Sequence, residues 1–194
     1  IKEAAAVAYP RDKMIGIWWS GAEPDVAPAG DGAKGYKALM LQHPAGKFKI
    51  HDDIKQFVLD KGKGQAKEDF GQVLYNRGLI NAFIGTEAIR TAQGKFGKKP
   101  LTGEQVQWGF DHLNITAERI KEAGFEWLML PLKLTCEDHQ GADVARVHQW
   151  DGQKWNIISD FYTADRSVLD PLVAEQSAKY AKEKNITPRD CSKG

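Results

Sequence analysis

The sequence lacks an excess of charge of either sign. Its 194 residues carry 27 Lys and Arg against 26 Asp and Glu. No strongly basic surface is therefore expected, and we predict no nucleic-acid partner. Long apolar runs are missing too, since none approaches the roughly 20 residues that cross a bilayer. We expect a globular chain with one good-sized core or two small ones.

Signatures of catalysis are equally scarce. Ser20-Gly21 has no glycine two positions before the serine, as a nucleophile elbow requires. The stretch 136–139 places Cys, Glu, Asp and His side by side, where they cannot easily converge on one ion, so we interpret it as a surface loop. We predict a binding protein without a catalytic residue, metal or cofactor. The histidines lack the spacing of a metal site or triad: His43, His51, His112, His139 and His148.

One glycine-rich segment matches a nucleotide-binding pattern. Residues 30–35 read Gly-Asp-Gly-Ala-Lys-Gly, which fits G-x-G-x-x-G. That motif binds a pyrophosphate when it follows a strand directly and opens a helix. Here it follows a loop containing proline and precedes an apolar run, the reverse of that context. We therefore interpret the glycines as part of a turn or short helix.

The chain is organised around residues 14–41. Two apolar runs, 14–19 and 36–41, flank a loop rich in Pro and Gly. Such runs are typical of buried parallel strands, which are covered on both faces. Ligands of open α/β sheets bind beyond the carboxyl ends of strands. We therefore expect a ligand site at the end of the first run: Trp19, Ser20, Gly21, Ala22 and Glu23.

The remaining segments predict alternating helices and strands. An alanine-rich composition ended by Pro10 predicts a helix over 1–9. Helical spacing or capping residues indicate further helices from Asp52 or Asp53 to the glycines at 62 and 64, and over 70–93, 103–113, 117–123 and 170–184. An apolar run predicts a strand over 125–134. Asp151-Gly152 predicts a hairpin turn between strands at 144–150 and 154–159.

Three neighbouring segments resemble the second lobe of the periplasmic solute-binding proteins of branched-chain amino-acid ABC transporters. They are the tryptophan-rich run, Ser20–Val26 and Ala29–Tyr36. This resemblance implies an α/β fold of two flavodoxin-like lobes that trap a ligand between them. Members are roughly twice this length, so the chain resembles only their C-terminal half. It implies a second-lobe segment at 1–46, a first-lobe segment at 47–140 and a return to the second lobe at 141–194.

The resemblance also implies roles for individual residues. An acid after the second-lobe strand takes a solute ammonium, and Glu23 is the candidate. The start of the long helix contacts ligand, which points to Tyr75 and to Arg77 as a carboxylate partner. A structural ion pair for Arg77 and simple packing for Tyr75 are equally good interpretations of these residue types. Trp18 and Trp19 make an aromatic carboxylate a competitor to an amino acid.

We therefore expect an exported, non-enzymatic protein. It captures a branched-chain amino acid or related carboxylate and delivers it to ABC permease subunits, which are its only contact with the membrane. Its export signal would lie outside this chain. A ligand-sensing domain of the same fold and a small α/β enzyme are the alternatives. The exported setting allows a disulfide between Cys136 and Cys191, against two unrelated thiols. We also expect uncovered apolar surface, so that this chain self-associates or binds ligand only weakly.

Overall fold

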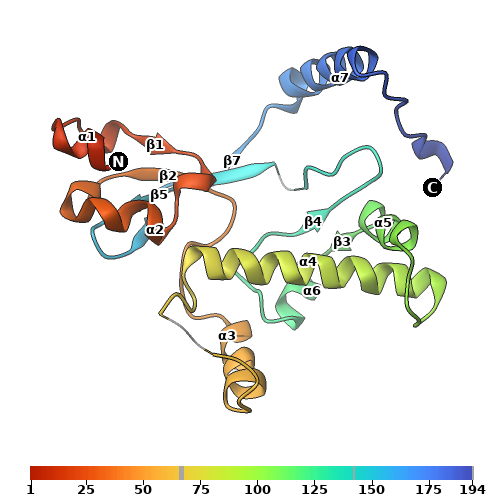
Figure 1. Ribbon diagram of the computed structural model, residues 1–194, viewed down its shortest axis with the longest axis horizontal. Coiled ribbons are helices and arrows are strands. Elements are labelled where there is room, and N and C mark those ends of the chain that lie inside the picture. The colour runs from red at the N-terminus through yellow and green to blue at the C-terminus, as the bar shows by residue number, and fades with distance from the viewer. Residues whose placement is uncertain (66–67, 142, 194) are drawn as a thin grey trace.

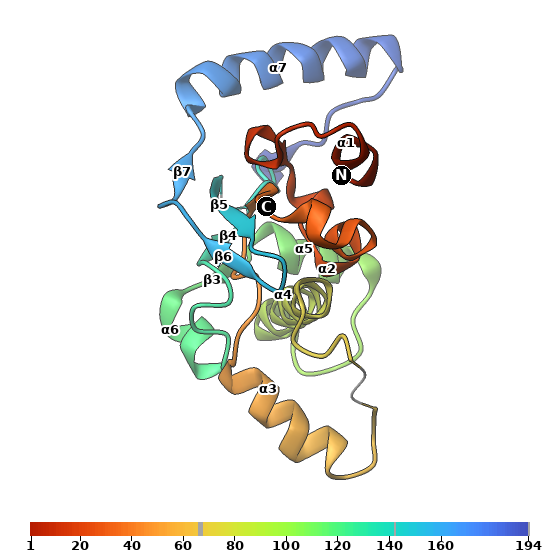
Figure 2. The same cartoon turned by 90° about the vertical axis from the view of Figure 1, so that its left-hand side faces the viewer.

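The computed structural model describes residues 1–65, 68–141 and 143–193. Figure 1 shows the N-terminal helices and the main sheet on one side and α4 to α6 with a small sheet on the other, and α3 and α7 project at opposite ends in both views (Figures 1 and 2). The α-helices are α1 (Lys2–Ala6), α2 (Glu23–Val26), α3 (Lys49–Ile54), α4 (Val73–Phe96), α5 (Gly103–Asp111), α6 (Ala117–Glu122) and α7 (Arg166–Glu183). The strands are β1 (Ile15–Gly16), β2 (Lys37–Met40), β3 (Asn114–Ile115), β4 (Leu132–Lys133), β5 (Val144–Trp150), β6 (Trp155–Ile157) and β7 (Tyr162–Thr163).

The main sheet has the order β1-β2-β5-β6, with β7 also pairing with β5, and β3 and β4 form a second sheet. β1 and β2 are parallel, as predicted, whereas β5 runs antiparallel to β2. The predicted hairpin is confirmed by the pairing of Trp150 with Trp155. The Asp151 carboxylate accepts from the backbone N–H groups of Gln153 and Lys154 at 2.8 and 2.9 Å, and these bonds fix the turn.

The prediction of a buried strand over 14–19 is largely wrong. Only Ile15–Gly16 is a strand, and Trp18–Ser20 is a 3₁₀ turn in which the Ser20 N–H donates to the Ile17 carbonyl at 3.0 Å. The side chains of Ile15, Ile17 and Trp19 are 59%, 57% and 67% exposed. β1 lies at the sheet edge, and these side chains meet solvent because no described layer covers them.

Helix starts were predictable where a side chain caps the backbone. Thr102 and Gln105 form the predicted capping box at α5, and Thr116 accepts from the Arg119 N–H at 3.3 Å at α6. The predicted turn or short helix at 30–35 is confirmed as the end of a 3₁₀ segment, Ala27–Ala33. The predicted helix from 70 begins instead at Val73.

Two other helix starts were placed wrongly. α3 begins at Lys49 and continues as a π-helical turn over Lys55–Leu59, and Asp53 pairs with Lys49 at 2.5 Å instead of capping. α7 begins at Arg166, because Asp165 accepts from the Ser167 N–H at 3.0 Å and so caps the helix earlier than expected. Pro171 therefore lies inside the helix, where it cannot donate to the preceding turn.

The strand predicted over 125–134 is confirmed only at Leu132–Lys133. Phe125 and Leu128 are buried, but their N–H groups donate to Ile120 and Phe125 within local turns. Apolar runs of this length do not separate a strand from buried turns by periodicity alone. The Trp127 backbone, at a φ of 68°, is left-handed and incompatible with a continuous strand.

The described chain packs around two apolar cores. The assignment of 1–46, 47–140 and 141–194 to lobes stays a prediction, although the two cores draw on different parts of the chain. The sheet core consists of Ala22, Val26, Ala33, Tyr36, Ala38, Met40, Val73, Trp150 and Trp155. The helical core consists of Phe48, Ile80, Phe83, Ala88, Leu113, Ile115, Ile120, Phe125, Leu128 and Met129.

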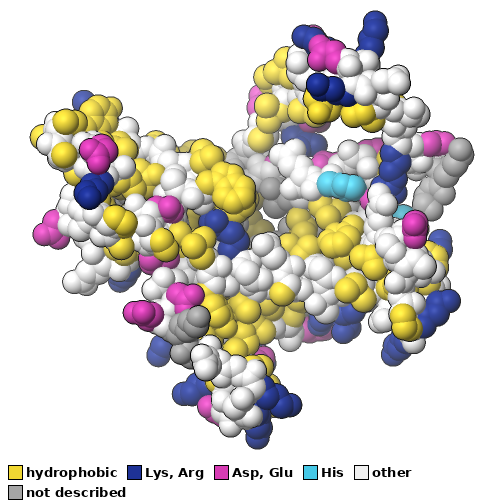
Figure 3. Space-filling model, in the orientation of Figure 1, with side chains coloured by type: hydrophobic (Ala, Val, Ile, Leu, Met, Phe, Trp, Pro, Cys, Tyr) yellow, Lys and Arg dark blue, Asp and Glu magenta, His cyan; other side chains and the backbone are white. Residues whose placement is uncertain are grey.

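Helix α7 differs from the other long helices because none of its residues is buried. Its apolar side chains include Leu172 and Val173, which are 51% and 59% exposed. Figure 3 shows apolar side chains along the underside of α7 and on the surface below it. Among the described residues, no helix is both long enough and apolar enough to cross a membrane.

Candidate solute-binding site

A cavity of about 190 Å³ lies where the first part of α4 meets the segment after β2 and the segment around β4. Its described walls are mainly apolar, with three amides and one cation. Trp18 comes from the sheet side of the molecule, whereas Arg77 and Ile80 come from α4. The lining residues are Trp18, Leu41, Gln42, Arg77, Ile80, Asn81, Ile84, Met129, Leu130, Leu132 and Gln140.

Arg77 is the only charged residue in that described lining. Its guanidinium donates to the Trp18 carbonyl oxygen at 2.9 Å and lies 4.3 Å from the centroid of the Trp18 ring. The Nε atom of Arg77 is buried and has no hydrogen-bond partner in the described part of the chain. Burial lowers the pKa of Arg77, but an arginine stays charged at any physiological pH. The cavity therefore holds a positive charge with an unused donor.

Glu23 lies beside the cavity without lining it. Its Oε2 accepts a hydrogen bond from the backbone N–H of Val73, the first residue of α4, at 3.1 Å. Gln42 donates from Nε2 to the carbonyl oxygen of the same Val73 at 3.1 Å. Burial raises the pKa of Glu23, although its backbone hydrogen bonds oppose the shift.

Tyr75 and Arg77 are not brought together. Two positions apart on α4, they point in different directions. Tyr75 packs against Phe70 and His51 with ring centroids 4.8 and 6.3 Å away. Burial, followed by the charge of Asp69, raises the pKa of Tyr75. Its contacts in the structure are those of an aromatic packing cluster.

The loop residues predicted to contact ligand make mostly structural contacts. Trp19 stacks on Trp18 at 4.1 Å between ring centroids and is otherwise exposed. Ser20 accepts from the Tyr36 hydroxyl at 3.0 Å. A Cβ at Gly21 would lie 2.9 Å from that of Ala38, so the backbone approaches β2 closely there.

Ala22 is 2% exposed, and its N–H donates to the Asp25 carboxylate at 2.9 Å. Of the seven predicted ligand residues, Arg77 alone is among the described lining residues. The ligand-binding role of each of the seven stays a prediction.

Sequence reasoning missed the amide side chains Gln42, Asn81 and Gln140 and most of the apolar wall. Part of that wall had a usable signal, because Ile80, Asn81 and Ile84 follow Arg77 at helical spacing and so share its face of α4. Gln42 and Gln140 had no such signal, since they lie outside regular elements in chain segments that meet only after folding.

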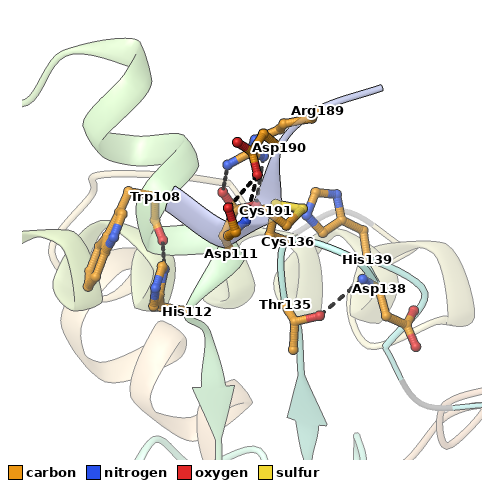
Figure 4. Close-up of a disulfide and its surroundings, with 11 residues drawn as sticks. Trp108, Asp111, His112, Thr135, Cys136, Asp138, His139, Arg189, Asp190 and Cys191 are labelled. Atoms are coloured by element: carbon orange, nitrogen blue, oxygen red, sulfur yellow. Dashed lines mark hydrogen bonds and ion pairs between the residues drawn. A yellow bond between two sulfur atoms is a disulfide. The ribbon is translucent and has the colours of Figure 1, made fainter. Parts of the chain in front are cut away.

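A second polar cluster surrounds the predicted disulfide, which the structure confirms between Cys136 and Cys191, with their Cα atoms 5.6 Å apart. Figure 4 shows Asp111 from α5 facing Arg189 next to this bond. Asp111 accepts from both Arg189 and His139, the latter at 2.8 Å. The Arg189 hydrogen bond is the main cause that lowers the pKa of Asp111. The cluster fastens the C-terminal segment to α5.

In the described part of the chain, no group of three or more His, Cys, Asp or Glu side chains could hold a metal ion. Three of the four adjacent side chains at 136–139 make other contacts. Cys136 is in the disulfide, Asp138 pairs with Arg166 at 2.9 Å and His139 bonds Asp111. Their structural contacts agree with the interpretation of a loop anchored at Cys136.

Comparison with solved structures finds two similar proteins, both described as parts of ABC transporters. It is similar to a structure from the Pseudomonas fluorescens group described as an ABC transporter permease, with 51% sequence identity and a TM-score of 0.88. It is also similar to a branched-chain amino-acid ABC transporter from Thermus thermophilus with bound valine, at 22% identity and a TM-score of 0.65. No protein-family model matched, and no curated protein did.

The similarity covers 98% and 86% of this chain but 46% and 44% of the two solved chains. The chain thus spans about half the length of the structures it matches. The second neighbour has the type I periplasmic-binding-protein fold, so the predicted α/β fold is confirmed. Neither neighbour is described as an enzyme.

Proposed function

We propose that the protein is the solute-binding component of an ABC importer and that it holds the carboxylate of a small solute at Arg77. The observation that carries this proposal is the buried Nε donor of Arg77 in a mainly apolar cavity. A guanidinium with free donors is suited to a carboxylate, which it binds through charge-assisted hydrogen bonds. Ligand sites of this kind combine apolar walls with a few convergent polar groups.

The partners of such a protein are the small solute and the permease subunits that receive it. The likeness to two ABC transporter components supports this context. The disulfide supports an oxidising compartment, and we propose the periplasm. Delivery would follow from a ligand-driven shift between open and closed lobes, since a solute held between two lobes favours the closed form.

The neighbour described as a permease favours a second candidate, in which this protein is itself part of the translocating subunit. A screen by thermal shift separates the two candidates. The protein expressed from its complete gene, without other transporter subunits, should be melted with branched-chain amino acids and with aliphatic and aromatic acids. A bound solute at 100 times its dissociation constant stabilises the protein by about 2.7 kcal/mol, which shifts the melting temperature measurably. A panel without any stabilising solute would contradict the solute-binding role.

A further inference from the structure

We propose that the solute is an apolar carboxylic acid without an ammonium group, and that Glu23 is a positioning residue for α4 rather than the partner of an ammonium. This inference rests on the proposed function, because it takes Arg77 as the carboxylate partner. It concerns the chemical class of the solute and departs from the amino acid that the resemblance implies.

The Glu23 carboxylate is already engaged. The first N–H groups of a helix have no acceptor within that helix, and Glu23 supplies one for Val73 at 3.1 Å. A negative charge is also favourable at this end of a helix. Val73 is 0% exposed and packs in the sheet core. The residues that α4 contributes to the helical core lie further along the helix. Glu23 thus holds the start of α4 against the sheet.

This attachment sets the position of Arg77. Arg77 lies one helical turn after Val73 on the same face of α4. Both backbone polar groups of Val73 are held, the N–H by Glu23 and the carbonyl oxygen by Gln42. The guanidinium is then oriented by the ring and carbonyl of Trp18. Glu23 and Gln42 therefore act on the solute through the placement of Arg77.

The charges that this chain contributes to the cavity match a lone carboxylate. Its described lining holds one cation and no carboxylate. A solute carboxylate would neutralise Arg77. An α-ammonium would enter the same small space beside a positive charge. It would also exchange water for the mainly apolar surface of Ile80, Ile84 and Met129, and this loss of hydration is costly without an anionic partner.

Matched pairs of solutes test the inference. Binding of 3-methylbutanoate against valine, and of 3-phenylpropanoate against phenylalanine, should be measured by calorimetry on the protein expressed from its complete gene. In the pair that fits the cavity, we expect the acid to bind at least about tenfold more tightly than its amino derivative, a difference of about 1.4 kcal/mol. Equal or tighter binding of the amino acid would overturn the inference.

Variants of Glu23 give a second readout. The amide oxygen of Glu23→Gln can still accept from Val73, so this variant should recover most of the acid affinity that Glu23→Ala loses. An ammonium partner would behave differently, because the neutral amide would lose amino-acid binding almost as completely as alanine does. Melting curves of both variants report whether each is folded.

Arg77→Gln separates this inference from the proposed function. If Arg77→Gln leaves the binding of every solute intact, the proposed carboxylate site is wrong. If Arg77→Gln abolishes binding but amino acids bind more tightly than their matched acids, the site stands and only the inference about the ammonium group fails.

Discussion

Arg77 and Trp18 meet across the cavity, one from the long helix α4 and the other from the turn after β1. The guanidinium lies over the indole ring at 4.3 Å and donates to the backbone carbonyl of Trp18 at 2.9 Å. This contact joins the helical and sheet parts of the molecule. The Nε–H of Arg77 is buried and has no hydrogen-bond partner among the described residues.

Replacement of Arg77 by lysine should weaken carboxylate binding. A lysine ammonium keeps the charge but loses the planar fork and the stacking on Trp18, so we expect a loss of about 10- to 100-fold in affinity, measured by calorimetry. Arg90→Lys is the matched control, because Arg90 lies on the same helix with an exposed side chain and pairs with Glu87. Equal losses in both variants would contradict a specific role for Arg77.

Loss of the disulfide should destabilise the fold. Cys136 and Cys191 close a loop with a sequence separation of 55, and in the chain-entropy model such a cross-link contributes about 4 kcal/mol by restricting the unfolded state. The double variant Cys136→Ser, Cys191→Ser should therefore unfold at a lower urea concentration than the parent. The parent in reductant should move toward the variant, and the variant itself should not respond to reductant. Coincident curves for all of these samples would contradict a stabilising bond.

Acid should destabilise the protein through His148 before most carboxylates titrate. His148 is fully buried, and burial, followed by the nearby charges of Arg146 and His43, lowers its pKa from 6.5 to about 3. The unfolded chain therefore binds a proton that the folded chain excludes. Stability is present above pH 6.5 and falls as the pH drops toward about 3, by at most about 1.4 kcal/mol per pH unit for this group.

The variant His148→Phe tests this assignment because it keeps a ring of similar size without a titrating group. Urea unfolding should be measured in steps from neutral pH down to about pH 4, where the parent should lose more stability than the variant. Asp151, whose pKa is lowered to about 2 by hydrogen bonds to the turn, contributes only at lower pH. Parallel stability curves for parent and variant would show that His148 does not carry the effect.

Self-association of the 194-residue chain should depend on α7. Val168, Leu172, Val173 and Tyr180 on this helix are all more than half exposed. Contiguous apolar surface of this kind favours association, so Leu172→Lys with Val173→Lys should shift sedimentation toward the monomer. Glu175→Lys changes the charge of the same helix at an exposed polar position and serves as control. A parent that is already monomeric at high concentration would refute the expectation.

Local chemistry made several elements predictable from the sequence. The capping box at Thr102 and the Asp-Gly turn at 151–152 work through hydrogen bonds between neighbours, so their residues alone specify them. Asp170-Pro171 has the pattern of a helix start, but Asp165 caps the helix five residues earlier. The strand expected over 125–134 failed because buried turns and buried strands share the same apolar composition.

The candidate site was less predictable because it is assembled from distant segments. Arg77 was predicted from the resemblance, which implies a ligand contact at the start of the long helix, and it lies in the described cavity lining. The engagement of Glu23 with Val73, fifty residues away, depends on how α4 meets the sheet and has no local pattern. Gln140 was missed for the same reason, since only the folded chain brings it to Arg77.

The most direct test of the central claim is a crystal structure of the protein expressed from its complete gene, bound to the carboxylic acid that stabilises it most. The account predicts a carboxylate oxygen within hydrogen-bond distance of Arg77 Nε, with the apolar body of the solute against Ile80 and Met129 and with Glu23 still bonded to the Val73 N–H. A solute bound away from Arg77 would contradict the account.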